Sequence, residues 1–206
     1  MNEIWIYGLG NVGEKYSQTK HNIGRIIVDR LTKQMNAGWK KASDFVEISE
    51  VLDQDLKLVF LRSLGYMNES GKPLRTYLEY RKPEVLPVIL IVQDDSDQLV
   101  GHAKLVIGGG TAGHWGIDSI YKEMLSHISS QDFLRLKIGV RPDLNRSKSE
   151  TFVLSAIDKR EIEFVTGLVK ILLSPETLLY LQNHEYSKLQ TLINSFDIIE
   201  ESPSKT

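Results

Sequence analysis

Hydrophobic positions along this chain recur at two different periods, and each period predicts a different kind of secondary structure. After Asn22, apolar residues stand at positions 23, 26, 27, 28 and 31, which is helical spacing. The pattern predicts a helix from Asn22 to about Met35, with Asn22 as the N-cap. Similar patterns predict helices over 68–80, about 115–126, near 158–173 and over 176–195.

Short apolar runs predict strands between these helices. The run Val85–Val92 is almost continuously apolar, as in a central strand that is covered on both faces. Residues 134–140 alternate basic and apolar side chains, so this strand is expected to be half exposed. Further strands are expected at 3–8, 45–51, 56–61 and 104–107, the middle two forming a hairpin. The interleaved order predicts a single α/β domain with a mixed central sheet flanked by helices on both faces.

The length of 206 residues suits one such domain, expected at 1–199, followed by a polar, frayed tail at 200–206. No apolar run approaches the roughly 20 residues that a membrane helix needs, and no signal-peptide pattern opens the chain. The chain has no cysteine, which excludes disulfides, thiolate metal sites and cysteine nucleophiles. We therefore expect a cytoplasmic protein without a membrane partner.

The net charge of −2 does not by itself indicate a nucleic-acid-binding protein, but the charge is unevenly distributed. Residues 133–148 contain several basic side chains against one acidic residue, Asp143. A basic stretch in a nearly neutral protein is either a phosphate-binding face or an ordinary solvated surface. The charge pattern alone leaves both interpretations open.

The sequence GLGNVG at 8–13 follows the first predicted strand and matches the G-x-G-x-x-G fingerprint of dinucleotide-binding proteins. That fingerprint places its third glycine inside a helix, whereas residues 14–22 are polar and lack helical apolar spacing. A nicotinamide-dependent enzyme is therefore the less favoured interpretation. The favoured one is a sharp turn at the end of a strand, where α/β proteins commonly bind ligands.

Several polar residues are candidates for chemistry. His21 precedes a predicted helix, and it is either a general base or an ordinary surface histidine. The aspartates at 94, 95 and 97 follow a predicted strand, where they would bind a metal, orient a histidine or form a solvated turn. Asn68 is either a helix cap or a side-chain amide for a substrate carbonyl. The glycine-rich residues 108–116 are either a flexible loop or a backbone anion site. A metal hydrolase would draw its ligands from Asp94, Asp95, Asp97, His102 and His114.

Taken in order, these segments resemble the bacterial-type peptidyl-tRNA hydrolase family. GLGNVGEKYSQTKHNIG at 8–24 is similar to that family's G-L-G-N-P-G-x-x-Y-x-x-T-R-H-N-x-G block, and YMNESG at 66–71 to its F/Y-M-N-x-S-G block. Residues 93–120 are similar to its D-D-x-D-x-x-x-G and G-G-x-x-G-H-N-G-x-x-S/D-I blocks, and 133–142 to F-x-R-L-R-I-G-I-G-R-P. The motifs match collinearly from about residue 4 to 154, which is far more specific than any one of them.

The resemblance implies hydrolysis of the ester between a peptide and the 3′ ribose of tRNA by a monomer, with tRNA as partner and no metal or organic cofactor. By position, His21 would be the general base that activates water, and Asp94 would fix its tautomer. The other implied contacts are Asn11 and Asn68 to the peptide and its carbonyl, Met67 in the cleft floor, Tyr16 near the tRNA 3′ end, His114 and Trp115 to substrate, and Lys104, Arg135 and Lys137 to phosphates.

The chain departs from the family pattern at four places: at positions 12, 20 and 115, and at the run IGVRP, which lacks the second glycine of I-G-I-G-R-P and should end its strand one residue earlier. Trp115 stands where the family has the Asn of G-H-N-G, and an indole has one N–H donor and far more bulk than an amide. Val12 replaces a proline and is expected to loosen its turn, whereas Lys20 replaces an arginine and is expected to be a mild change. Trp115 keeps a second hypothesis open: a specialised relative that binds tRNA or other RNA without turnover, or acts on a different acyl-tRNA.

Overall fold

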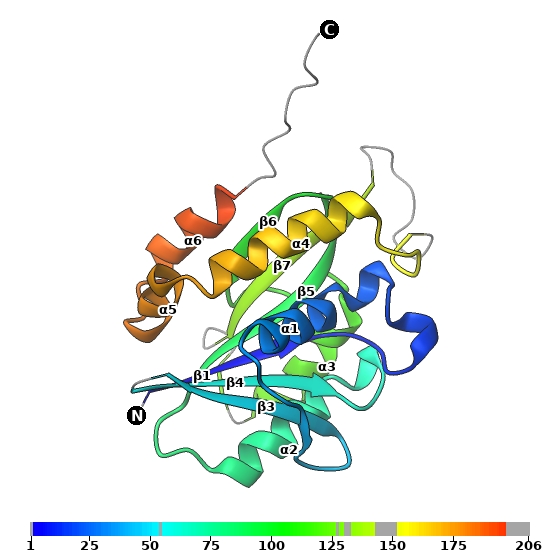
Figure 1. The fold of residues 1–206 in the computed structure, drawn as a ribbon. Helices are drawn as coiled ribbons and strands as arrows, with labels where there is room; N and C mark the ends of the chain where they lie inside the picture. Colours follow the sequence, from blue (N-terminus) through cyan, green and yellow to red (C-terminus); the bar gives the residue numbers. More distant parts are fainter. Residues whose placement is uncertain (1, 54, 127, 130–132, 143–151, 197–206) are drawn as a thin grey trace, which may run out of the picture.

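The computed structural model describes residues 2–53, 55–126, 128–129, 133–142 and 152–196 (Figure 1). Within them, seven strands form one sheet in the order β2-β3-β4-β1-β5-β7-β6. The strands are β1 (Asn2–Gly8), β2 (Lys40–Lys41), β3 (Val46–Asp53), β4 (Leu56–Ser63), β5 (Val88–Leu99), β6 (Ala103–Ile107) and β7 (Phe133–Arg141). The central strands β4, β1, β5 and β7 are parallel, while β2 and β3 at one edge and β6 at the other pair antiparallel. The predicted mixed sheet is confirmed.

Helices cover both faces of this sheet (Figure 1). One face packs against α1 (Ile23–Gln34), α4 (Lys159–Leu172), α5 (Pro175–Gln182) and α6 (Tyr186–Asn194), and the other against α2 (Gly71–Arg81) and α3 (Trp115–Met124). Successive side chains of β1 alternate between two cores: Ile4 and Ile6 face the α1 side, whereas Trp5 and Tyr7 face the α2 side. Burial on both faces explains why the central strands are continuously apolar.

Two predicted helix ranges need correction, and the predicted N-cap of α1 is confirmed in position but not in its bonding. The helix expected at 68–80 begins at Gly71, because residues Met67–Glu69 form a separate 3-10 helix, η3, that contains Asn68. Asn22 does occupy the N-cap position of α1, but its side chain makes no capping bond. The helix expected at 176–195 is divided into α5 and α6 by a turn in which His184 adopts a left-handed backbone conformation with φ of 57°.

Two predictions about strands are also wrong. β5 continues through residues 94–97 to Leu99, so the aspartates lie within a strand rather than in a turn after it. β7 is almost entirely buried instead of half exposed, because it lies between β5 and β6 in the sheet. Arg135 of β7 is therefore held inside the protein and is only 4% exposed, whereas Lys137 and Arg141 are partly exposed.

No single helix among the described residues is long and apolar enough to cross a membrane. Helices α4 and α5 have the combined length and apolar composition of a membrane span only when they are taken together, and the chain bends by 60° between them. The apolar side chains of both helices, including Leu168 and Leu181, are buried in the core on the α1 face. The predicted boundary between the domain and its tail at 199 lies outside the described residues.

Three loops meet beyond the carboxyl ends of the parallel strands, which is where open α/β sheets place ligand sites. One loop follows β1 and leads through the 3-10 helix η2 (Lys20–Asn22) into α1. A second follows β4 and contains η3. The third loop comprises residues 108–114. Because β6 is antiparallel to β7, β6 ends at the amino ends of the parallel strands, and this loop runs from there back to the start of α3. These loops bring the residues of the candidate site together.

Candidate active site

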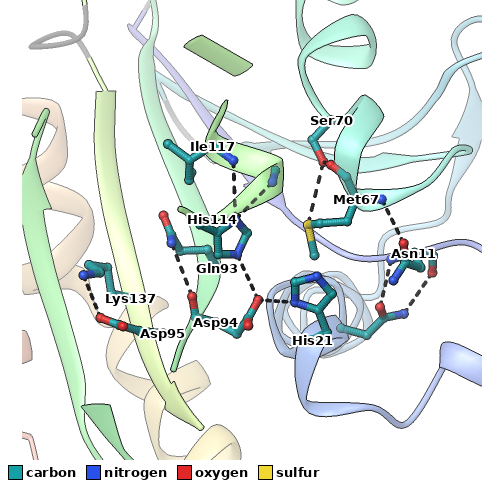
Figure 2. Close-up of polar contacts among 12 residues, drawn as sticks. Asn11, His21, Met67, Ser70, Gln93, Asp94, Asp95, His114, Ile117 and Lys137 are labelled. Carbon is teal, nitrogen blue, oxygen red and sulfur yellow. Dashed lines mark hydrogen bonds and ion pairs between the residues drawn. The ribbon is translucent and has the colours of Figure 1, made fainter. Parts of the chain in front are cut away.

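A partly buried hydrogen bond joins His21 to Asp94 at the centre of the site (Figure 2). His21 lies on η2 and Asp94 on β5, and His21 Nδ1 is 2.8 Å from Asp94 Oδ1. The side chain of Asp94 is 3% exposed and that of His21 is 16% exposed. A carboxylate accepts hydrogen bonds, so Nδ1 of His21 carries the proton and Nε2 keeps its lone pair. This arrangement leaves Nε2 available to accept a proton from a water or a substrate.

His114 binds the same carboxylate oxygen from the other side. Its Nε2 is 3.0 Å from Asp94 Oδ1, and its Nδ1 accepts hydrogen bonds from the backbone N–H groups of Gly116 (3.1 Å) and Ile117 (3.4 Å) (Figure 2). His114 is thus the N-cap of α3. Because Nδ1 accepts these two bonds, Nε2 is the nitrogen that donates to Asp94. Asp94 therefore receives two imidazole donors on one oxygen.

These contacts shift the ionisation of the pair in opposite directions. Burial disfavours the charged imidazole of His21, but the hydrogen bond and the negative charge of Asp94 outweigh burial, so the pKa of His21 lies above its usual value. Burial would raise the pKa of Asp94, but His114 and His21 together hold that pKa well below its usual range. The lowered pKa favours the carboxylate form of Asp94.

Asn11 has its side-chain amide fixed in one orientation. The backbone N–H of Met67 donates to Asn11 Oδ1 at 2.8 Å (Figure 2). The side chain of Asn22 holds the Asn11 backbone on both sides: Asn11 N donates to Asn22 Oδ1 at 2.8 Å, and Asn22 Nδ2 donates to Asn11 O at 2.9 Å. Since Oδ1 accepts this bond, Nδ2 is the group of the Asn11 side chain that can donate a hydrogen bond.

Val12 strengthens this loop in a way that proline would not. Its backbone N–H donates to Gly65 O at 3.1 Å, which links the loop after β1 to the loop after β4. A proline has no N–H, so the family residue would lose this bond. The expected loosening at Val12 is thus offset by a hydrogen bond worth about 0.5–1.5 kcal/mol.

A cavity of about 450 Å³ opens beside the His21–Asp94–His114 cluster. Its other walls include Asp95, Lys137, Trp115 and Leu154. Trp115 is the first residue of α3 and is 69% exposed. The volume is within the range of pockets that bind small ligands or parts of larger ones.

The remaining predicted substrate contacts lie around this cluster at different depths. Met67 is buried, and its sulfur would be only 2.7 Å from a Cβ atom at position 116, so glycine there lets α3 start close against it. Asn68 is exposed and lines a second cavity of about 510 Å³, which shares Trp115 with the first. Tyr16 is half-buried and meets the ring of Tyr66 edge to face, with centroids 6.4 Å apart.

The three basic residues expected to contact phosphates have different surroundings. Arg135 is buried and donates to Gly110 O at 2.9 Å, so it braces the glycine-rich loop; this burial does not fit the expected phosphate contact. Lys137 faces the first cavity, but its Nζ is 2.6 Å from Asp95 Oδ2 (Figure 2). Lys104 is exposed on the edge strand β6. Of the basic stretch at 133–148, Arg146 and Lys148 lie outside the described residues.

Sequence reasoning missed the contacts that hold η2 in place. Lys20 and Glu161 form an ion pair of 2.6 Å whose side chains are 7% and 1% exposed, so Lys20 is not at an exposed site. The backbone N–H of His21 donates to Val153 O at 2.7 Å. Neither contact left a local signal, because residues 153 and 161 are far from His21 along the chain.

The site has one group of side chains able to hold a metal ion among the described residues, namely His21, Asp94 and His114. Their candidate ligand atoms lie within 4.8 Å of one another, but the same atoms hydrogen-bond each other. His102, proposed from the sequence as a ligand, lines a separate cavity near the start of β6. The glycine fingerprint at 8–13 is followed by 3-10 turns, with Gly13 outside any helix, so the helix that a dinucleotide site requires is missing there.

A single α/β domain with a partly buried His–Asp pair at the carboxyl edge of its sheet is suited to acid–base chemistry. The sequence model of the family described as peptidyl-tRNA hydrolase matches residues 5–200. The chain therefore belongs to the peptidyl-tRNA hydrolase family, a family of hydrolases, and the resemblance seen in its motifs is confirmed.

Relatives support the same assignment. A peptidyl-tRNA hydrolase of Aliarcobacter butzleri is 36% identical over 165 residues, which cover 80% of this chain and 85% of the relative. One of Fervidobacterium nodosum is 32% identical over 193 residues, covering 94% and 97%. The crystal structure of peptidyl-tRNA hydrolase from Acinetobacter baumannii matches with a TM-score of 0.79 and covers 96% of each chain, at 24% identity. That structural match supports the fold.

Proposed function

We propose that this protein hydrolyses the ester that links a peptide, or an N-blocked aminoacyl group, to the 3′ ribose of tRNA. Family membership supplies the reaction class, and the 2.8 Å contact between His21 and Asp94 is the observation that carries the mechanism. His21 acts as the general base through Nε2, and Asp94 orients the imidazole and stabilises its charged form.

The reaction proceeds in two proton transfers. His21 Nε2 takes a proton from water as the water oxygen bonds to the ester carbon, which gives a tetrahedral oxyanion. Asn11 Nδ2 donates a hydrogen bond to that oxygen. The carbon–oxygen bond to the ribose then breaks, and the imidazolium returns its proton to the 3′ oxygen of tRNA. The products are tRNA with a free 3′ hydroxyl and a peptide with a free carboxyl group.

His21→Ala tests this mechanism. The variant lacks the base, so kcat on an N-acetyl-aminoacyl-tRNA is expected to fall by about 10²–10⁴. His102→Ala is the matched control, since His102 is an exposed histidine outside the cavity. The two variants are compared for release of the acyl group and for thermal unfolding. A His21→Ala variant that folds normally and keeps wild-type turnover would contradict the mechanism.

A second candidate function follows from Trp115, which occupies the cavity wall at the family's Asn position. The chain would then be a specialised relative that binds acyl-tRNA without turnover or acts on a different acyl-tRNA. Trp115→Asn separates the two candidates. Hydrolysis that appears, or rises at least tenfold, in this variant supports the specialised relative, whereas a wild-type rate unchanged or lowered by the substitution supports the first candidate.

A further inference from the structure

Two large apolar side chains stand in the walls of the catalytic cavity and are open to solvent. Trp115 is 69% exposed and Leu154 is 53% exposed, and both line the cavity that contains His21 and Asp94. Exposed apolar groups that share one concave site mark a place where an apolar ligand is bound. The cavity therefore combines the polar side chains of the candidate site with an apolar surface formed by Trp115 and Leu154.

Leu154 is held next to His21 by the backbone. The N–H of His21 donates to Val153 O at 2.7 Å, and the N–H of Lys20 donates to Ser155 O at 3.0 Å. These two bonds lie on either side of Leu154 and are followed by a bridge between Thr19 and Ala156. The position of Leu154 is therefore fixed relative to the proposed base.

The side chains of the cavity lining that could act as cations are already bound to carboxylates. Lys137 is bound to Asp95 at 2.6 Å, and His21 and His114 share Asp94. A phosphodiester would have to displace one of these carboxylates to gain a cation. An uncharged group meets no such cost, so this cavity suits the acyl part of the substrate better than the nucleic-acid part.

We propose that Trp115 and Leu154 form a binding site for the side chain of the amino acid that is esterified to tRNA, and that this site favours aromatic and bulky aliphatic residues over glycine. The proposal rests on the function proposed above and adds its acyl specificity. Burial of one aromatic side chain between these two walls is expected to favour the larger substrate by roughly tenfold or more in kcat/KM.

The test compares N-acetyl-Phe and N-acetyl-Gly carried on the same tRNA. Wild-type protein is expected to hydrolyse the phenylalanyl substrate with at least about tenfold higher kcat/KM. Trp115→Ala and Leu154→Ala are each expected to reduce this ratio severalfold, and Trp115→Phe to keep most of it. Tyr80→Ala is the control, since Tyr80 is a helical aromatic residue that is 73% exposed and lies outside the cavity.

The ratio separates a specific site from general damage, because a loss of folded or active enzyme lowers both rates equally. Equal wild-type kcat/KM on the two substrates would overturn the acyl site and leave the proposed hydrolase function standing. An unchanged ratio of the two kcat/KM values in correctly folded Trp115→Ala would show that the indole does not contact the acyl side chain and would also overturn it. No hydrolysis of either substrate by wild-type protein would overturn the hydrolase function itself.

Discussion

His21 is placed between two opposing influences on its pKa. Burial disfavours the imidazolium, and Asp94 favours it, with the balance on the side of Asp94. A general base must be neutral before it takes a proton, so a raised pKa confines full activity to higher pH. In the mechanism proposed above, the same carboxylate also stabilises the imidazolium that forms when His21 takes the proton. Asp94 would therefore lower the fraction of neutral His21 at low pH but assist the proton transfer itself.

The first prediction concerns pH. Wild-type kcat/KM is expected to rise with pH through an inflection above about 6.5, the ordinary pKa of histidine, because His21 loses its proton there. In Asp94→Asn the negative charge is removed while burial remains, so the inflection moves to lower pH. The rate at the plateau falls by about 10²–10⁴, because the imidazolium and its tautomer are no longer supported.

Asp97→Asn is the control for this experiment, since Asp97 lies on the same strand but its side chain is 76% exposed. Its inflection is expected to coincide with that of the wild type. An inflection that stays in place in Asp94→Asn would show that Asp94 does not set the pKa of the base.

Asn22 and His114 show that the sequence does not reveal which hydrogen bonds an individual side chain makes. Asn22 precedes a helix, and the general preference for Asn at N-caps predicts the wrong partner, because its amide is used by the backbone of Asn11. His114 does cap a helix, with Nδ1, while its Nε2 reaches Asp94. A side-chain type limits which bonds are possible, but only the placement of distant loops decides which are made.

Among the secondary-structure elements, η2 is bound to the C-terminal half of the protein by an ion pair and by backbone hydrogen bonds. The buried pair of Lys20 with Glu161 links η2 to α4, and Glu161 also accepts from the backbone N–H of Asp158 at the start of that helix. The adjoining segment at 152–157 adds backbone bonds to the same side. His21 therefore depends on residues more than 130 positions away for its position.

The second prediction tests this fastening. Lys20→Ala leaves the carboxylate of Glu161 buried without its cation, which is expected to lower the free energy of unfolding by about 3–5 kcal/mol. Urea denaturation followed by circular dichroism measures the change. Lys188→Ala is the control, because its pair with Glu185 is exposed and such pairs contribute little. A Lys20→Ala midpoint as close to wild type as that of Lys188→Ala would show that the pair does not stabilise the fold.

The helices and strands themselves were largely predictable, because hydrophobic periodicity and the residues that end an element are local features of the sequence. The order of strands in the sheet was not, since β7 inserts between β5 and β6 although β6 precedes it in the sequence. That insertion buries Arg135 on a strand whose alternating pattern predicted exposure. It also brings Lys137 onto Asp95, so two of the three predicted phosphate ligands already have partners within the protein.

For the whole molecule, a net charge of −2 means that any attraction for tRNA must be local. Lys104 is the predicted phosphate ligand that stays exposed, on the edge strand β6. It lies directly opposite Lys137 in the antiparallel pair of β6 and β7, so both side chains project from the same face of the sheet. Lys137 opens into the cavity beside His21 on that face, so Lys104 projects on the same side of the sheet as that cavity, and we expect it to contact the body of a bound tRNA.

The last prediction follows from this geometry. Lys104→Ala is expected to raise KM for an acylated tRNA and to reduce the slope of log KM against log salt by about one, because one fewer phosphate is neutralised. An N-acetyl-aminoacyl ester of adenosine has no phosphodiester, so its hydrolysis should be unaffected by the substitution. Lys33→Ala is the control, since Lys33 is exposed at the end of α1 remote from His21. If the salt slope of Lys104→Ala equals that of Lys33→Ala, the edge strand β6 takes no part in holding tRNA, and the phosphate contacts must come from another face.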